Sequence, residues 1–280
     1  MKLLVTVDVE RDPFGVGSPT YHGLELGFPQ ILGSLRDAGL RATMFFSGEV
    51  AESHPETIRI AASEGHEVGC HGFDHSLGYL NRQPPDVVAR DIVRGRRAIE
   101  ASIGSQPSLF RAPNFSADLA VLREVANAGF TVDSSILPGR LVRRWRFLTL
   151  LDQRGTSGVP HYPLAPVNQG HGTSLLEVPL TPTTATSGAP VGLGLVNSHG
   201  ADSVLSEAKA VPRSYVMFLA HPWEAINLAS FQTNAPAWVR RACQSSLVQF
   251  DRFLESVAQD FDVVTMTTVA REWRARLGTA

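Results

Sequence analysis

Two histidines spaced four residues apart are the first sign of chemistry in this sequence. They occur in the stretch His71-Gly72-Phe73-Asp74-His75. If the stretch forms a helical turn, both imidazoles lie on one face of it, about 6 Å apart along the axis. Two neutral imidazoles, a carboxylate and a water make a catalytic zinc site. The spacing alone is a weak signal, because nine histidines in 280 residues give about 0.3 such pairs by chance.

The third ligand of such a site would have to be acidic. The segment Asp8-Val9-Glu10 offers two carboxylates two residues apart, at the end of the first apolar run. Residue types alone do not choose between these two carboxylates.

Ionisable side chains follow five of the apolar runs. Parallel α/β folds carry their chemistry at the carboxyl ends of their strands. The residues in these positions are Asp8, His71, Arg111, Asp133 and His221. One such residue would mean little, since every strand must end in something polar. Five with complementary chemistry indicate a site for metal-assisted hydrolysis.

The elements that position these residues can be predicted from the apolar pattern. The expected strands are Leu3–Val7, Thr43–Phe46, Glu67–Cys70, Leu109–Phe110, Phe130–Val132, Leu175–Val178, Tyr215–Ala220 and Asp262–Thr265. The expected helices are Pro29–Ala38, Pro55–Glu64, Pro85–Ile103, Ala117–Ala128, Pro236–Ala258 and Thr268–Leu277. Glycine follows three of these helices, where a left-handed cap is wanted. The alternation predicts a mostly parallel sheet, open or closed into a barrel.

The segment from Arg140 to Ala210 breaks this alternation. Its part Pro179–Pro190 is rich in Thr, Pro, Ala, Ser and Gly, a composition typical of loops. Nothing in the sequence forces a domain boundary. We therefore expect one domain over residues 1–280, with an irregular, loop-rich portion at 140–210.

The composition is that of a globular protein. The chain has 25 Lys and Arg against 27 Asp and Glu, a net charge of −2, with 43% hydrophobic and 19% charged residues. This balance excludes a generally basic protein that coats nucleic acid, and it argues against disorder. No run approaches the ~18 apolar residues of a membrane span.

Two cysteines, Cys70 and Cys243, are too few for a disulfide scaffold or a four-cysteine zinc site. They suit a reducing compartment. Acidic residues at 8, 10 and 12 interrupt the apolar start of the chain, so it predicts a first strand and no export signal. We therefore expect a cytoplasmic protein. The alternative is a leader that was removed and is not part of this sequence.

The sequence resembles the polysaccharide deacetylase superfamily, the NodB-homology domain of carbohydrate esterases of the family-four type. Five motifs occur in order between residues 4 and 224. They are Thr6-Val7-Asp8-Val9-Glu10, His71-Gly72-Phe73-Asp74-His75, Phe110-Arg111-Ala112-Pro113-Asn114, Asp133-Ser134-Ser135 and Leu219-Ala220-His221-Pro222-Trp223-Glu224. The last two are similar to a branch associated with exopolysaccharide production. The resemblance implies a distorted (β/α) barrel of about seven mostly parallel strands.

One position departs from the family pattern. The first motif of the family has two adjacent aspartates, and the second, a metal ligand, aligns with Val9, which cannot bind a metal. Some relatives have their carboxylates two residues apart, as in Asp8-x-Glu10. The resemblance therefore implies Glu10, His71 and His75 as the metal ligands, with Asp12 a weaker substitute. The rival interpretation is weak or lost metal affinity.

The resemblance also implies a mechanism, the removal of an N-acetyl group from an amino sugar. Asp8 would be the general base, oriented by Arg111. The oxyanion would lie on the metal, most simply Zn²⁺, and on the backbone N–H of Asn114. His221 would be the general acid, and Asp133 the carboxylate that raises its pKa.

Simpler interpretations exist for several of these residues. Arg111 would otherwise be a surface arginine, and Asp133 the cap of a turn. Trp223 would either form a wall against the sugar or belong to the core. His66 and Cys70 are expected to be structural, because His66 begins a strand and Cys70 points away from His71.

Four arginines lie within eight residues, in Arg140-Leu141-Val142-Arg143-Arg144-Trp145-Arg146-Phe147. They could clamp the phosphate of a nucleotide- or lipid-linked sugar, with Trp145 packed beside it. Contact with an anionic membrane surface is a second interpretation, and a solvated face the third. Nucleic acid is an unfavoured partner.

The leading hypothesis is a metal-dependent deacetylase that acts on an amino sugar of a surface polysaccharide or of its carrier-linked precursor. A second hypothesis keeps the fold but changes the bond, as in deformylases or cyclic-amide hydrolases. A third is a carbohydrate-binding module that has lost its metal and its activity. The sequence leaves open the sugar, the carrier, the oligomeric state and the choice among divalent ions.

Overall fold

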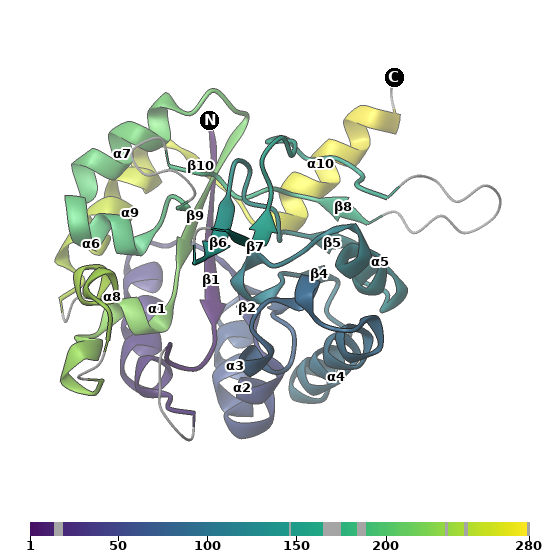
Figure 1. The fold of residues 1–280 in the computed structure, drawn as a ribbon. Coiled ribbons are helices and arrows are strands. Elements are labelled where there is room, and N and C mark those ends of the chain that lie inside the picture. The colour runs from purple at the N-terminus through teal and green to yellow at the C-terminus, as the bar shows by residue number, and fades with distance from the viewer. Residues whose placement is uncertain are drawn as a thin grey trace. The chain divides into compact units, whose positions relative to one another are not determined.

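A computed structural model describes residues 1–13, 19–145, 147–164, 175–183, 189–232, 235–243 and 246–278. Eight strands form one sheet in the order β10-β1-β2-β3-β4-β5-β8, with β9 also paired to β1 (Figure 1). Helices separate most of its strands along the chain, while the β6–β7 hairpin comes between β5 and β8. Strand β1 pairs in parallel with β9 and β10, and so do β3 with β4, β4 with β5, and β5 with β8. The expected fold class, a distorted (β/α) barrel of mostly parallel strands, is confirmed.

Contacts divide the chain into two compact units. Unit 1 comprises Met1–Met44, Gly65–Glu67 and Val191–Thr265, and unit 2 comprises Phe45–Glu64, Val68–Pro190 and Met266–Ala280. The boundary passes through strands β2 (Thr43–Phe46) and β3 (Glu67–Cys70). The expected single catalytic domain over residues 1–280 stays a prediction.

Unit 1 is built on β1 (Lys2–Val9), β9 (Tyr215–Ala220) and β10 (Asp262–Val263). Its helices are α1 (Phe28–Asp37), α6 (Leu193–His199), α7 (Ala201–Ala210), α8 (Ala237–Ala242) and α9 (Val248–Asp260), with short turns η1 (Gly23–Gly27), η5 (Pro222–Ala225) and η6 (Leu228–Ser230). Strand β9 is buried along its whole length, as its continuous apolar sequence predicts. Phe218 in this strand stacks on Phe253 of α9, with ring centroids 4.5 Å apart.

Unit 2 continues with β4 (Leu109–Phe110), β5 (Val132–Asp133) and β8 (Leu176–Glu177). Its helices are α2 (Gly48–Ser53), α3 (Pro55–Ser63), α4 (Pro85–Ile103), α5 (Leu119–Asn127) and α10 (Met266–Gly278), with short turns η2 (His75–Leu77), η3 (Leu80–Arg82) and η4 (Pro113–Phe115). Strands β6 (Leu141–Arg144) and β7 (Leu148–Asp152) form a separate antiparallel hairpin (Figure 1).

The expected strands at 43–46, 67–70, 109–110 and 215–220 match the structure residue for residue, and so does the helix at 85–103. Glycines 39, 65 and 129 have positive φ angles, as the predicted helix caps require. The long helix expected at 236–258 is instead α8 and α9. Residues 140–210 were expected to be loop-rich, but they contain the β6–β7 hairpin, α6 and α7. The expected loop at 179–190 lies partly outside the described residues.

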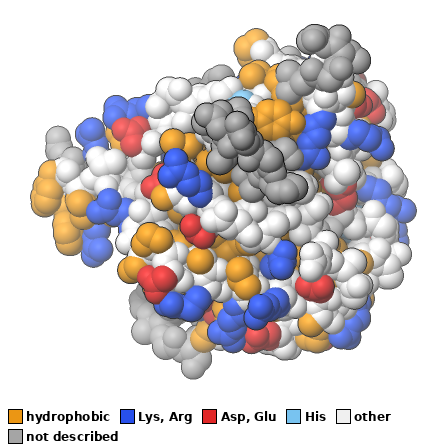
Figure 2. All heavy atoms as spheres, turned by 90° about the vertical axis from the view of Figure 1, so that its right-hand side faces the viewer, with side chains coloured by type: hydrophobic (Ala, Val, Ile, Leu, Met, Phe, Trp, Pro, Cys, Tyr) orange, Lys and Arg blue, Asp and Glu red, His pale blue; other side chains and the backbone are white. Residues whose placement is uncertain are grey.

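The face drawn in Figure 2 carries lysine and arginine side chains interspersed with acidic and apolar ones. Among the helices that the structure describes, none has the length and apolar character needed to span a membrane.

Candidate active site

The predicted site residues divide between the two units. Unit 2 contains His71, His75, Arg111, Asn114, Asp133 and Trp145, and unit 1 contains Asp8, Glu10, His221 and Trp223.

His71 follows β3 and is buried. Its Nδ1 lies 2.9 Å from the carbonyl oxygen of Arg111. A carbonyl only accepts hydrogen bonds, so Nδ1 carries the proton and Nε2 keeps the lone pair that a metal needs. The ring of the half-buried His75 lies 5.7 Å away between centroids, tilted by 43°. The two histidines are therefore close enough to bind one ion.

The helical turn expected between His71 and His75 does not form. Gly72 has a φ of +68°, and the short helix η2 begins only at His75. The two rings approach each other because the loop folds back at Gly72.

The loop between the two histidines is anchored by Asp91 of α4. The buried Asp91 carboxylate accepts the backbone N–H of Phe73 at 3.0 Å and of Asp74 at 2.8 Å. A side chain on Gly95, one turn later in α4, would come within 2.5 Å of the carbonyl oxygen of Gly72. Helix α4 therefore packs directly on the loop, and Asp91 fixes its shape. Asp91 was not predicted from the sequence, although an aspartate on the apolar face of a helix is an unusual placement.

Arg111 follows β4 and is fully buried. Its Nε donates to the carbonyl oxygen of Ser134 and its Nη2 to the Ser134 hydroxyl, both at 3.0 Å. The guanidinium also lies 4.3 Å from the ring centroid of Phe45. The alternative of a surface arginine is therefore wrong. Its pairing with Asp8 stays a prediction.

Asp133 ends β5 and has a second carboxylate beside it. It accepts the backbone N–H of Ser135 at 3.0 Å and the Ser135 hydroxyl at 2.8 Å. Asp133 pairs in register with Glu177 of β8, and both side chains are fully buried. Burial raises the pKa of both carboxyl groups, and the neighbouring Asp133 raises that of Glu177 further.

Glu177 was also missed by the sequence analysis. The signal was an acidic residue inside the apolar run Leu175-Leu176-Glu177-Val178. A fully buried carboxyl group on a strand is rare unless it has a partner.

Asn114 has the unusual φ of +56°, and the next residue, Phe115, has a φ of +55°. The Asn114 side chain donates to the carbonyl oxygen of Gly78 at 3.1 Å. Its own carbonyl accepts from Arg140 at 3.1 Å. Two consecutive residues in the left-handed region cost about 1 kcal/mol or more each, and such strain concentrates at functional sites. The geometry makes the backbone at Asn114 a fixed feature of unit 2.

In unit 1, β1 and β9 run parallel with Val7 opposite Ala220. Asp8 and His221 therefore leave the two strands side by side. Asp8 and Glu10 are both buried. The carboxyl ends of these two strands thus gather the acidic and imidazole groups that the sequence predicts there.

His221 is surrounded by carboxylates. Its Nδ1 lies 3.2 Å from Oε2 of Glu224, and its Nε2 lies 4.0 Å from Oε1 of Glu10. Burial lowers the pKa of His221, but the negative charges of Glu224, Glu10 and Asp8 outweigh it and raise the pKa to about 9. The imidazole is therefore protonated at neutral pH.

Glu224 had no role in the sequence analysis. It lies three residues after His221, at the third position of the short helix η5, and its side chain reaches back to the His221 backbone. This is the capping-box arrangement, which the spacing could have predicted. The expected partnership of His221 with Asp133 stays a prediction.

Trp223 is buried in a cluster with Ile226, Leu228, Ala235, Val239 and Cys243. Its indole N–H donates to Glu10 Oε1 at 3.3 Å. Its ring stacks on His221 with centroids 4.6 Å apart. Of the two roles considered for Trp223, these contacts favour the core, and contact with a sugar stays a prediction.

The carboxylate of Asp12 accepts several hydrogen bonds from residues of its own unit. Its carboxylate accepts the hydroxyl of Thr20 at 2.9 Å and the backbone N–H groups of His22 and Gly23 at 2.8 Å each. These bonds hold the start of η1. They make Asp12 a structural residue and a poor substitute for Glu10.

Other residues have the structural roles expected of them. His66 Nδ1 accepts the backbone N–H of Ala42 at 3.1 Å, and burial raises the pKa of the Cys70 thiol far above its usual range. Trp145 is exposed at the tip of the β6–β7 hairpin. Arg146 lies outside the described residues, so the four-arginine cluster is described at three positions.

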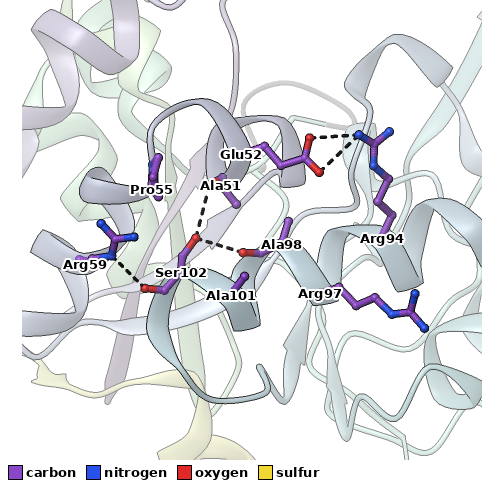
Figure 3. Close-up of a pocket in the computed structure, with 9 residues that line it drawn as sticks. All are labelled: Ala51, Glu52, Pro55, Arg59, Arg94, Arg97, Ala98, Ala101 and Ser102. Atoms are coloured by element: carbon purple, nitrogen blue, oxygen red, sulfur yellow. Dashed lines mark hydrogen bonds and ion pairs between the residues drawn. The ribbon is translucent and has the colours of Figure 1, made fainter.

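A groove of about 480 Å³ between α2, α3 and α4 is lined by Ala51, Glu52, Pro55, Arg59, Arg94, Arg97, Ala98, Ala101 and Ser102 (Figure 3). Several of the charged side chains that line the groove are already bound by neighbouring groups. Arg94 pairs with Glu52 at 3.0 Å, and Arg59 donates to the carbonyl of Ser102 at 3.2 Å. No predicted site residue lines this groove, so it is separate from the candidate catalytic groups of unit 2.

Comparison with known proteins gives a partial match in sequence. Residues 20–132 match the family model described as polysaccharide deacetylase. A peptidoglycan-N-acetylglucosamine deacetylase of Bacillus cereus is 30% identical over 102 residues, which are 36% of this chain and 46% of that protein. A chitin deacetylase of Colletotrichum lindemuthianum is 31% identical over 110 residues, 37% of this chain and 43% of that protein. The alignments thus span less than half the length of these relatives.

Comparison with solved structures extends over nearly the whole chain. One of these structures is a Mycobacterium smegmatis protein whose name assigns it as a candidate polysaccharide deacetylase. The two structures superpose with a TM-score of 0.65 at 22% sequence identity, over 98% of this chain and 90% of that one. This likeness shows a shared fold. The segment that matches polysaccharide deacetylases in sequence, residues 20–132, contains His71, His75, Arg111 and Asn114.

Proposed function

We propose that this protein is a metal-dependent hydrolase that removes an N-acetyl group from an amino sugar of a surface polysaccharide, or of its nucleotide- or lipid-linked precursor. The observation that carries the proposal is the histidine pair, in which His71 is fixed with Nε2 available and His75 lies beside it. The match of residues 20–132 to polysaccharide deacetylases supports it. The named relatives act on peptidoglycan N-acetylglucosamine and on chitin, which supports an N-acetylated sugar as substrate.

Glu10, His71 and His75 are the proposed metal ligands. Glu10 and His71 are buried, and the half-buried His75 lies beside His71 in the same unit, which supports these three side chains as ligands. Two imidazoles and a carboxylate suit Zn²⁺ first and other divalent ions as well. Such an ion polarises an amide carbonyl and lowers the pKa of water toward ~7.

The acid and base are proposed to come from unit 1. Asp8 takes a proton from the attacking water as the water oxygen bonds to the carbonyl carbon. The C–N bond then breaks, His221 gives its proton to the leaving nitrogen, and the acetyl group leaves as acetate. The raised pKa of His221, about 9, supports its role as the acid, because the imidazolium is present at neutral pH. We assign to Glu224 the role expected of Asp133, that of the carboxylate on His221.

The remaining residues are proposed to orient these groups. Arg111 orients Asp8, and its bonds to Ser134 support this role because they hold the guanidinium rigidly. The backbone N–H of Asn114 stabilises the oxyanion, and the strained, fixed backbone there supports that role. Three further points remain predictions. They are sugar contacts by Trp145 and Trp223, a substrate linked to its carrier through phosphate, and a cytoplasmic location.

The test combines metal analysis with product analysis. Freshly purified protein is expected to contain about one divalent ion per chain and to release acetate from N-acetylglucosamine oligomers. Release of formate, or opening of a cyclic amide, would instead favour the second hypothesis. Protein that binds the sugar but neither holds a metal nor releases a product would be the silent binding module.

A further inference from the structure

We propose that the tip of the β6–β7 hairpin binds an anionic membrane surface. Trp145 and Phe147 stand at this tip with exposed fractions of 63% and 82%. They are the two most exposed large aromatic side chains among the described residues. Their ring centroids are 6.3 Å apart, so the two rings form one continuous apolar surface at the tip. Single exposed apolar residues are common on protein surfaces, but these two adjacent rings present one apolar contact surface.

Two arginines give the tip a positive charge. Arg143 and Arg144 end β6, and both are exposed. The Arg144 guanidinium lies 4.3 Å from the ring centroid of Trp145. The acidic residue of the hairpin, Asp152, is bound by Arg154 at 2.6 Å. Within the part of the chain that the structure describes, Arg143 and Arg144 form no ion pair.

The backbone at the tip is strained. Trp145 has a φ of +52°, a region that favours glycine or asparagine. A bulky residue in this conformation costs about 1 kcal/mol or more. Glycine or asparagine would be less strained than tryptophan at this position, and the conformation holds the Trp145 ring next to Phe147 and Arg144.

An anionic bilayer fits this combination better than a neutral sugar does. Tryptophan and arginine side chains are both stable at the headgroup level, and phenylalanine inserts below it. Each arginine near an anionic surface adds about 1 kcal/mol of attraction. Neutral N-acetylglucosamine, without a phosphate carrier, offers no negative charge to Arg143 and Arg144, and Phe147 has no polar group to bond its hydroxyls.

The base of the hairpin is fixed to the candidate site of unit 2. Arg140 donates to the carbonyl of Asn114 at 3.1 Å, and Asn81 donates to the carbonyl of Leu150 at 3.0 Å. A membrane bound at the tip would therefore be held at a constant distance from Asn114. Binding of the tip to a membrane does not depend on the proposed hydrolase activity.

Co-sedimentation with lipid vesicles tests the proposal. The full chain is expected to bind vesicles of phosphatidylcholine and phosphatidylglycerol in equal parts, and to bind pure phosphatidylcholine much more weakly. The variant R143Q/R144Q should bind the anionic vesicles about thirtyfold more weakly. W145A/F147A should also lose binding, whereas the control W238A, which removes an exposed tryptophan of α8 in unit 1, should not.

A second measurement uses the unaltered protein. Brominated lipids in the same vesicles should quench its tryptophan fluorescence, and W145F should remove most of that quenching. Two results would overturn the proposal. One is the absence of binding to anionic vesicles. The other is hairpin variants that bind vesicles normally but lose binding to an N-acetylated polysaccharide, which would make the tip a glycan surface.

Discussion

One carboxylate oxygen of Glu224 holds both the ring and the backbone of His221. Glu224 Oε2 lies 3.2 Å from Nδ1 of His221 and accepts its backbone N–H at 2.8 Å. Because a carboxylate accepts, Nδ1 carries a proton, and the ring is turned so that Nε2 faces Glu10 at 4.0 Å. Glu224 thereby sets both the orientation and the charge of the proposed acid.

Replacing Glu224 by glutamine tests this relationship. Glutamine keeps the size of the side chain but removes the charge that stabilises the imidazolium. We expect kcat to fall at least about tenfold, with KM and the bound metal unchanged. The control is Glu255→Gln on the exposed side of α9. Wild-type kcat in Glu224→Gln would remove Glu224 from the account of His221.

Replacing Asp91 by alanine should loosen the loop that carries the two histidines. The variant loses the acceptor for two backbone N–H groups, those of Phe73 and Asp74. We expect metal affinity to fall about ten- to a hundredfold, measured by competition with a chelating dye. Asp86→Ala, at the exposed start of the same helix, should keep wild-type affinity. Equal affinities in the two variants would contradict the role given to Asp91.

The buried Asp133–Glu177 pair predicts how stability depends on pH. The pKa of Glu177 lies well above its ordinary value of 4.5, so this group takes up a proton when the chain folds. Its contribution to stability is complete below about pH 4.5 and is lost as the pH rises toward the folded-state pKa.

Glu177→Gln resembles the protonated form and does not titrate. The wild type should therefore lose stability relative to this variant by at least about 1 kcal/mol between about pH 5 and pH 8. Urea unfolding at several pH values measures the difference. Parallel stability curves for the two proteins would show that Glu177 is ionised in the folded state.

Asp8→Asn removes the proposed base and leaves a side chain of the same size. Turnover should fall by about a hundredfold or more, while the metal content and the unfolding temperature stay close to wild type. Asp37→Asn, an exposed aspartate of α1, is the control. If Asp8→Asn keeps its activity, another group takes the proton from water.

The sequence predicted the strands and their ends well, because continuous apolar runs have few ways to be buried. Asp8, His71, Arg111, Asp133 and His221 all lie at or next to the end of a strand, as expected. The β6–β7 hairpin, α6 and α7 were not predicted; they lie within residues 140–210, where the strand–helix alternation breaks and the sequence indicated loops.

The groups that hold the site were harder to predict. Asp91 acts on a loop 17 and 18 residues away along the chain, and Glu177 meets Asp133 across 44 positions. Contacts of this kind depend on how helices and strands pack together. The local sequence pattern around each residue does not predict that packing. The helical turn first considered for His71 and His75 was wrong because Gly72 takes a left-handed conformation.

A crystal structure of the metal-loaded protein, with anomalous data at the metal edge, would test the proposed metal site. We expect one strong peak, with a Glu10 oxygen, His71 Nε2 and a His75 ring nitrogen each about 2.0–2.2 Å from it. A peak held by other side chains, or no peak in fully loaded crystals, would contradict it.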